Sequence, residues 1–125
     1  MKLNNVRYGI IIATLVTAVA HLLASFDKIL FPDHVDPLFL LNGLGFLGLL
    51  GAYFLPIPVF QQRHNLVRIA LMAFAAITIA AWVFIWVIQY VIINGTPFFS
   101  HDSLYGVPAK IAEVILILLL RADKQ

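Results

Sequence analysis

The sequence predicts an all-α fold, a polytopic membrane protein built as a bundle of four transmembrane helices. Hydrophobic residues make up 62% of the 125-residue chain and charged residues only 11%, against about 25% charged in ordinary soluble domains. Four apolar stretches each approach the ~20 residues with which a helix crosses a bilayer. The alternation of polar and apolar residues typical of membrane β-barrels is absent. We therefore expect residues 1–125 to form a single transmembrane domain.

The expected spans cover residues 8–26, 38–54, 66–93 and 104–120, approximately. The first span, with basic residues before it and Ala18-Val19-Ala20 inside it, imitates a cleaved secretory signal. Its apolar run continues past this point, so we interpret it as a membrane helix. Proline and glycine in the segments between spans fit turns. Pro108 leaves open whether the last helix begins near residue 104 or only at Gly106 or Val107.

The distribution of basic residues predicts the orientation of the chain in the cell membrane. Short cytoplasmic segments of membrane proteins carry an excess of Lys and Arg. The two termini and the middle connection contain Lys2, Arg7, Arg63, Arg68, Arg121 and Lys124. The other two connections contain only Lys28. We therefore expect a multi-pass protein with cytoplasmic N- and C-termini.

Two opposite charges lie inside the last expected span. Counting ~1.5 Å per residue back from Arg121 places Lys110 ~16 Å and Glu113 ~12 Å from the inner edge, near the bilayer centre. Their three-residue separation puts them on one helix face, where they can pair. Two interpretations remain open, a structural ion pair that locks helix packing or part of a site for a ligand, ion or cofactor.

The first span carries a polar stripe at helical spacing, which we expect to face the bundle interior. Its members are Thr14, Thr17, His21, Ser25 and Lys28. The same counting places His21, Asn42 and Trp82 in one layer, slightly beyond Lys110. The candidates for a ligand site or an ion pair are therefore Lys110, Glu113, His21, Asn42 and Trp82. We predict no catalytic residues and no cofactor.

The expected external connections contain two histidines and two carboxylates that are weak candidates for a divalent metal such as zinc. They are His34, Asp36, His101 and Asp102. The chain has no cysteine, so thiolate metal sites and disulfide chemistry are excluded. We expect these four side chains to be solvated in the loops and to hold no metal.

The second expected span is rich in glycine. Residues 43–48 match the G-x-G-x-x-G pattern of dinucleotide sites, but they lie inside an apolar span without a preceding strand, so we reject that match. Gly45, Gly48, Gly51 and Ala52 instead predict a thin helix face for close packing, self-association or contact with other membrane subunits. Because the eight basic residues form no patch, we expect no nucleic-acid partner.

His21, the Leu40–Gly48 run and Lys110 together resemble an uncharacterised family of small four-helix integral membrane proteins found largely in archaea. The resemblance implies this fold and topology, and it implies no established activity. Members of that family often have an acidic residue before the lysine, whereas this chain has Ala109. Glu113 is therefore the candidate partner of Lys110.

The sequence is consistent with two functions. Short connections, the expected lack of a soluble domain and the glycine face favour a non-catalytic subunit or assembly partner of a larger membrane complex. The alternative is a binding or transport bundle for a lipid, quinone, ion or proton, with an intramembrane cavity containing Lys110, Glu113 and His21. An enzyme ranks lowest, because no nucleophile–base pair is visible.

Overall fold

The computed structural model describes residues 2–99 and 103–123, and within this part the regular structure is entirely helical. Four helices are long and apolar enough to cross a membrane, which confirms the predicted fold class. They are α1 (Asn5–Ser25), α2 (Pro37–Phe54), α4 (His64–Trp82) continued by η1 (Val83–Ile93), and α5 (Ser103–Ala122). A five-residue helix that the sequence analysis did not predict, α3 (Pro58–Gln62), connects α2 to α4.

Local capping explains where the first two helices begin. The Asn4 side chain accepts a hydrogen bond of 2.9 Å from the backbone N–H of Arg7 at the start of α1. Asp36 does the same for Phe39 at the start of α2, and Pro37 occupies the first helical position. Both arrangements satisfy N–H groups that a helix start leaves unpaired. The expected spans begin within three residues of these helices.

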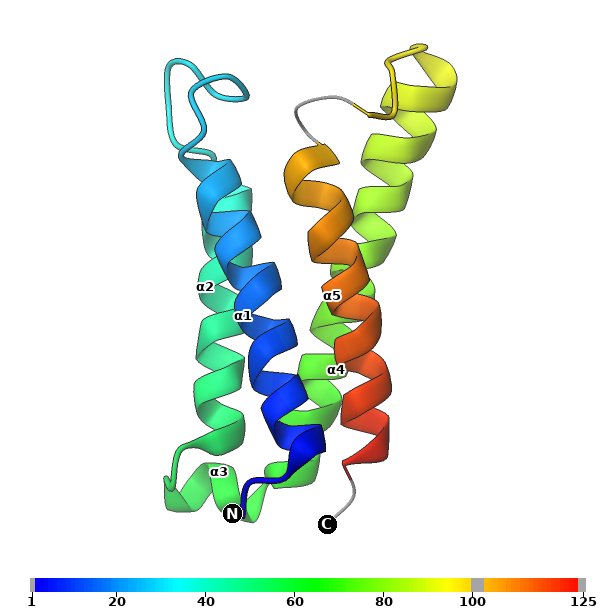
Figure 1. Cartoon of the computed structure of the whole chain (residues 1–125). Coiled ribbons are helices and arrows are strands. Elements are labelled where there is room, and N and C mark those ends of the chain that lie inside the picture. Colours follow the sequence, from blue (N-terminus) through cyan, green and yellow to red (C-terminus); the bar gives the residue numbers. More distant parts are fainter. Residues whose placement is uncertain (1, 100–102, 124–125) are drawn as a thin grey trace.

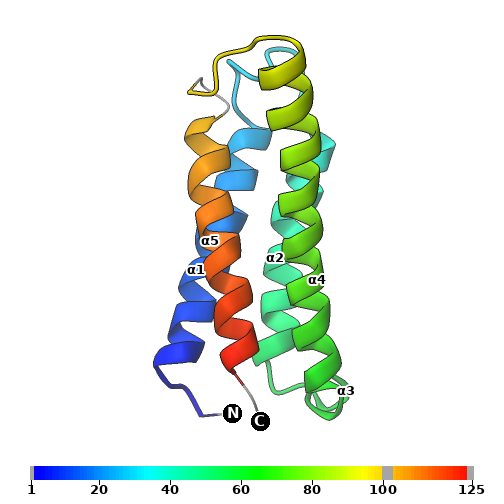
Figure 2. The same cartoon turned by 90° about the vertical axis from the view of Figure 1, so that its right-hand side faces the viewer.

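The four long helices form a ring in chain order. Helix α1 packs against α2 and α5, and α4 packs against the same two neighbours. Both termini and α3 lie at one end of the bundle, here called the termini end (Figure 1). The α1–α2 connection and residues 94–99 lie at the other, here called the loop end (Figure 2). The topology is therefore up-down-up-down.

The third span changes its helix geometry toward the loop end. At Val83 the helix widens from α to π geometry, and it closes with a bond from the N–H of Asn94 to the carbonyl of Gln89. Among the described elements η1 packs only against α4, and it diverges from α1 and α2 (Figure 1). Long π-helices are rare, and periodicity did not predict this one.

At the termini end, by contrast, side chains from all four helices converge. Arg7 Nε in α1 lies 3.1 Å from Oδ1 of Asp123, the residue that directly follows α5. The hydroxyl of Tyr53 in α2 donates to the same carboxylate. Arg68 in α4 donates through Nη1 to the carbonyl of Leu120, at 3.0 Å. We call Arg7, Tyr53, Arg68 and Asp123 the termini clasp, since they join α1, α2, α4 and the end of α5.

Candidate functional site

Lys110 and Glu113 form an ion pair near the middle of α5. Lys110 Nζ lies 2.9 Å from Glu113 Oε1 and 3.1 Å from Oε2. Glu113 has no exposed surface and Lys110 is 9% exposed. Because α5 begins at Ser103, Lys110 lies beyond its first turn, so the late start considered at Gly106 or Val107 was wrong. The predicted pairing is confirmed.

The pair extends into a chain of polar groups that crosses to α1. The Thr17 hydroxyl donates to Glu113 Oε2. His21 Nδ1 lies 2.8 Å from the carbonyl oxygen of Thr17 and 3.3 Å from its Oγ1. We call His21, Thr17, Glu113 and Lys110 the polar chain. It joins two helices through residues that are 96 positions apart in the sequence.

Four of the five members of the polar stripe face inward as expected, and for the fifth, Lys28, the expectation was wrong. Thr14, Thr17 and Ser25 are fully buried, and His21 is 5% exposed. Thr14 Oγ1 donates to the carbonyl of Ile10 at 2.7 Å and takes no part in the polar chain. Lys28 follows the end of α1 and is exposed.

The imidazole of His21 has one engaged nitrogen and one open nitrogen. A carbonyl oxygen only accepts hydrogen bonds, so Nδ1 carries the proton that it donates to Thr17. Among the described residues no group makes a hydrogen bond with Nε2. The rings of Phe39 and Phe46 in α2 lie with centroids 5.9 and 6.0 Å from the imidazole. The histidine thus presents an unpaired acceptor beside aromatic neighbours.

The two other candidates make different contacts. Asn42 Nδ2 donates to Thr78 Oγ1 in α4 at 3.2 Å, while its Oδ1 is buried without a partner in the described part of the chain. Trp82 packs against the ring of Phe98, and its indole closely covers Gly106 in α5. The structure thus brings together His21, Lys110 and Glu113, and it places Asn42 and Trp82 in separate contacts.

The metal candidates do not form a cluster in the part of the chain that the structure describes. Asp36 caps α2, and the exposed His34 places its ring 5.5 Å from that of Phe31. His101 and Asp102 lie outside the described residues. Within residues 2–99 and 103–123 no three His, Asp or Glu side chains are grouped to hold a metal ion.

The glycine face of α2 is only partly used within the chain. A Cβ added to Gly45 would lie 2.7 Å from the ring of Phe74, so α4 approaches closely there. Nothing lies within 4 Å of a Cβ at Gly48, and at Gly51 only Leu55 of the following turn does. Gly43, which we had left out of this face, packs directly against Leu22 and the Ala18 carbonyl of α1. The expected close approach at Gly48 is therefore wrong for contacts inside the bundle.

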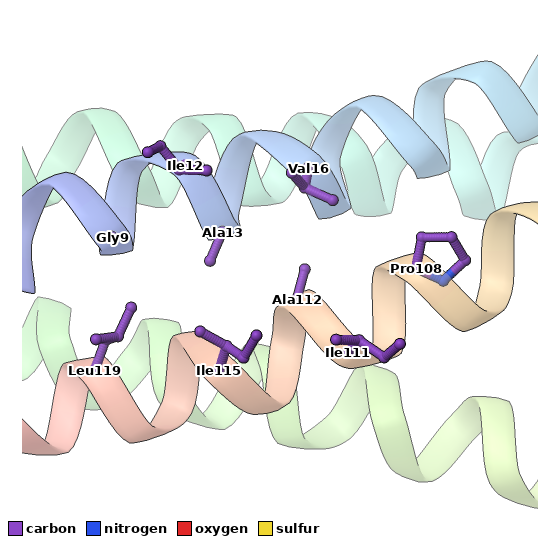
Figure 3. A pocket seen from close by; sticks show the side chains of 9 residues that line it. All are labelled: Gly9, Ile12, Ala13, Val16, Pro108, Ile111, Ala112, Ile115 and Leu119. Carbon is purple, nitrogen blue, oxygen red and sulfur yellow. The ribbon is translucent and has the colours of Figure 1, made fainter.

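An apolar groove runs along the outside of the same α1–α5 pair (Figure 3). It encloses about 490 Å³, and small side chains such as Ala13 and Ala112 form part of its wall. Its lining consists of Gly9, Ile12, Ala13, Val16, Pro108, Ile111, Ala112, Ile115 and Leu119. The polar chain uses other faces of these two helices, directed into the bundle.

Comparison with known proteins identifies the chain at the level of its family. The model for the Family of unknown function (DUF7475) matches residues 1–121. The chain belongs to this family. No curated protein and no solved structure matches it. The expected membership of an uncharacterised family is confirmed, and the DUF7475 match spans the entire polar chain.

Sequence reasoning placed Thr17 in the polar stripe but not among the site residues. Its position one helical turn before His21, at a depth similar to that of Glu113, is the signal that could have identified it. The termini clasp was also missed. The available signal was a pair of opposite charges, Arg7 near the start of the first span and Asp123 just after the end of the last span.

Proposed function

We propose that this member of the DUF7475 family is a multi-pass protein of the cell membrane with both termini in the cytoplasm. We further propose that the polar chain is its functional site, a place within the membrane where a small ion or polar head group binds or passes. The observation that carries the proposal is the fully buried Glu113, paired with Lys110 and linked through Thr17 to His21.

The polar chain contains a group beyond those that a purely structural contact between helices requires. Ionisable residues inside membrane spans cost free energy and commonly mark ion or substrate pathways. Lys110 and Glu113 compensate each other's charge, and Thr17 adds a bond between helices. His21 contributes an open acceptor that stabilises none of these bonds. This acceptor has no partner within residues 2–99 and 103–123, which supports a binding role over a purely structural one.

The test compares wild-type protein with the double variant Lys110→Met with Glu113→Gln, which removes both charges and keeps similar side-chain volumes. Each protein is reconstituted in liposomes, and fluxes of H⁺, Na⁺, K⁺ and Cl⁻ are measured beside native mass spectra of bound small molecules. We expect the double variant to fold and to lose one of these activities. If it retains every flux and every bound molecule of the wild type, the pair is structural and the proposal fails.

A non-catalytic subunit or assembly partner is the second candidate function. It is supported by the outward face of α2, where Gly48 has no neighbour within 4 Å of an added Cβ. Small residues on such faces permit close helix contacts between membrane proteins. Native mass spectrometry in a mild detergent separates the candidates. A stoichiometric protein partner favours the subunit, whereas a chain purified alone with a bound small molecule favours the binding site.

A further inference from the structure

The side-chain hydrogen bonds of the polar chain converge on the Glu113 carboxylate, from Lys110 on one side and from Thr17 on the other. Lys110 Nζ donates to both oxygens of Glu113, so this carboxylate acts as an acceptor. The hydroxyl proton of Thr17 must therefore point to Glu113. The lone pairs of Thr17 Oγ1 remain free to face the Nδ1–H of His21, 3.3 Å away. The Nδ1–H of His21, which donates to the Thr17 carbonyl oxygen at 2.8 Å, thus also lies beside Thr17 Oγ1, and the Thr17 hydroxyl donates to the carboxylate of Glu113.

The open end of this series lies near the loop end of the bundle. His21 is four residues before Ser25, the last residue of α1, a distance of ~6 Å along the helix axis. Its Nε2 has a free lone pair and no partner among the described residues, and the side chain keeps 5% exposure. The described charged groups nearest in this network are Lys110 and Glu113 of α5, while α2 contributes the uncharged rings of Phe39 and Phe46.

We infer that the species taken up by this site is the proton, with His21 Nε2 as the point of uptake and the Glu113 carboxylate as its destination. The inference rests on the proposed function and specifies its substrate. A proton from water at the loop end binds Nε2. The Nδ1 proton then passes to Thr17 Oγ1, and the former hydroxyl proton of Thr17 passes to Glu113 Oε2. One proton enters and one reaches Glu113, so His21 and Thr17 are neutral again.

The transfer has two consequences for the surrounding groups. Neutral Glu113 no longer balances the charge of Lys110, so proton uptake weakens the ion pair in α5. The Nδ1 lone pair of His21 then faces the carbonyl oxygen of Thr17, 2.8 Å away. Two acceptors in contact repel each other, so this tautomer favours return of the proton or rotation of the ring. The site can therefore take up a proton at Glu113 and then return to its starting protonation state.

Substitutions at Thr17 test the route with matched controls. Thr17→Val keeps the shape and removes the hydroxyl, whereas Thr17→Ser keeps the hydroxyl. Thr14→Val removes an equally buried hydroxyl outside the polar chain. After a rapid drop in pH, the infrared band of protonated Glu113, assigned by its loss in Glu113→Gln, reports arrival of the proton. The decay of the same band after a rapid return to high pH reports release of the proton and gives an independent rate.

We expect Thr17→Val to slow both rates about a hundredfold, the scale on which a positioned proton-transfer group acts. Thr17→Ser should recover most of the rate that Thr17→Val loses, because it keeps the hydroxyl, and Thr14→Val should stay close to wild type. His21→Phe should match Thr17→Val, and it replaces that variant if Thr17→Val does not fold. Wild-type rates in Thr17→Val or His21→Phe overturn the proton route. If the Lys110/Glu113 double variant still loses another ion or molecule, the proposed function survives that result.

Discussion

At the scale of single residues, the buried charges of Lys110 and Glu113 in α5 depend closely on each other. Glu113 is fully buried, and each of its oxygens accepts from Lys110, with a further bond from Thr17. Such a pair is weak support for stability as a whole, because burying two charges costs much of what their attraction returns. Its members depend on each other, because removing one leaves the other buried without compensation.

This dependence predicts a strongly non-additive pair of substitutions. Lys110→Met alone should destabilise the protein by about 3–5 kcal/mol, since Glu113 is left charged or must take up a proton. The double variant with Glu113→Gln should be more stable than this single variant. Thermal unfolding in detergent of both single variants and the double variant completes the cycle. Simple addition of the two single effects would show that the residues do not interact.

At the scale of one element, α2 contains two glycines in opposite situations. A Cβ at Gly43 would lie 2.8 Å from Leu22 Cγ and 3.0 Å from the carbonyl oxygen of Ala18, and that backbone oxygen has little freedom to move. At Gly48 the space is empty within the chain. The same residue type therefore permits close packing at one position and leaves an open face at the other.

Gly43→Ala should thus destabilise the protein by about 1–3 kcal/mol, the usual range for overpacking. Gly48→Ala should leave stability unchanged or raise it by up to about 1 kcal/mol, since alanine favours a helix over glycine. Melting temperatures of the two variants in detergent check the difference. A loss of stability or of an oligomer in Gly48→Ala alone would instead reveal a partner on this face.

The third span shows how an element can differ along its length. Helix α4 packs against both of its neighbours, whereas η1, among the helices that the structure describes, contacts only α4, which it continues. The helices are therefore held together most extensively toward the termini end, where buried core side chains from all four spans meet. The open end of the polar chain, at His21, lies toward the less constrained loop end.

At the scale of the whole molecule, the termini clasp holds the four spans together at one end. Asp123 is its centre, because it accepts from both Arg7 and Tyr53. Asp123→Ala should cost about 3–5 kcal/mol, since it leaves Arg7 buried without its partner. Tyr53→Phe removes one hydrogen bond to the same carboxylate and should cost about 1–3 kcal/mol. Chemical or thermal unfolding should rank the variants in this order, and equal losses would contradict a central role for Asp123.

The proposed orientation is also a property of the whole chain. A reporter fused to the C-terminus should lie in the cytoplasm, because most basic residues flank that side. Cysteines replacing the exposed His34 in the α1–α2 connection and the exposed Arg63 at the other end of the bundle give a matched pair. In intact cells an impermeant reagent should label the cysteine at position 34 and spare the one at position 63. The opposite pattern would reverse the topology.

Features that depend on neighbours along the chain were predictable from the sequence. Hydropathy alone located the four spans, because a helix that crosses a membrane must be apolar over a continuous stretch. The Lys110–Glu113 pair followed from a three-residue separation within one helix. The inward polar stripe of α1 followed from the helical period of 3.6 residues. These properties are set by backbone geometry, which each segment carries by itself.

The tertiary structure alone decided which helix faces meet. No local pattern relates Thr17 to Glu113, Arg7 to Asp123, or Gly43 rather than Gly48 to the packing of α1, because these contacts depend on the relative rotation of helices far apart in sequence. That rotation is settled by the fit of side chains across all the interfaces at once. The sequence by itself determined four apolar helices, the last of which carries Lys110 and Glu113 within its span. Their packing determined that those charges connect through a threonine to a histidine, one nitrogen of which has no partner in the described part of the chain.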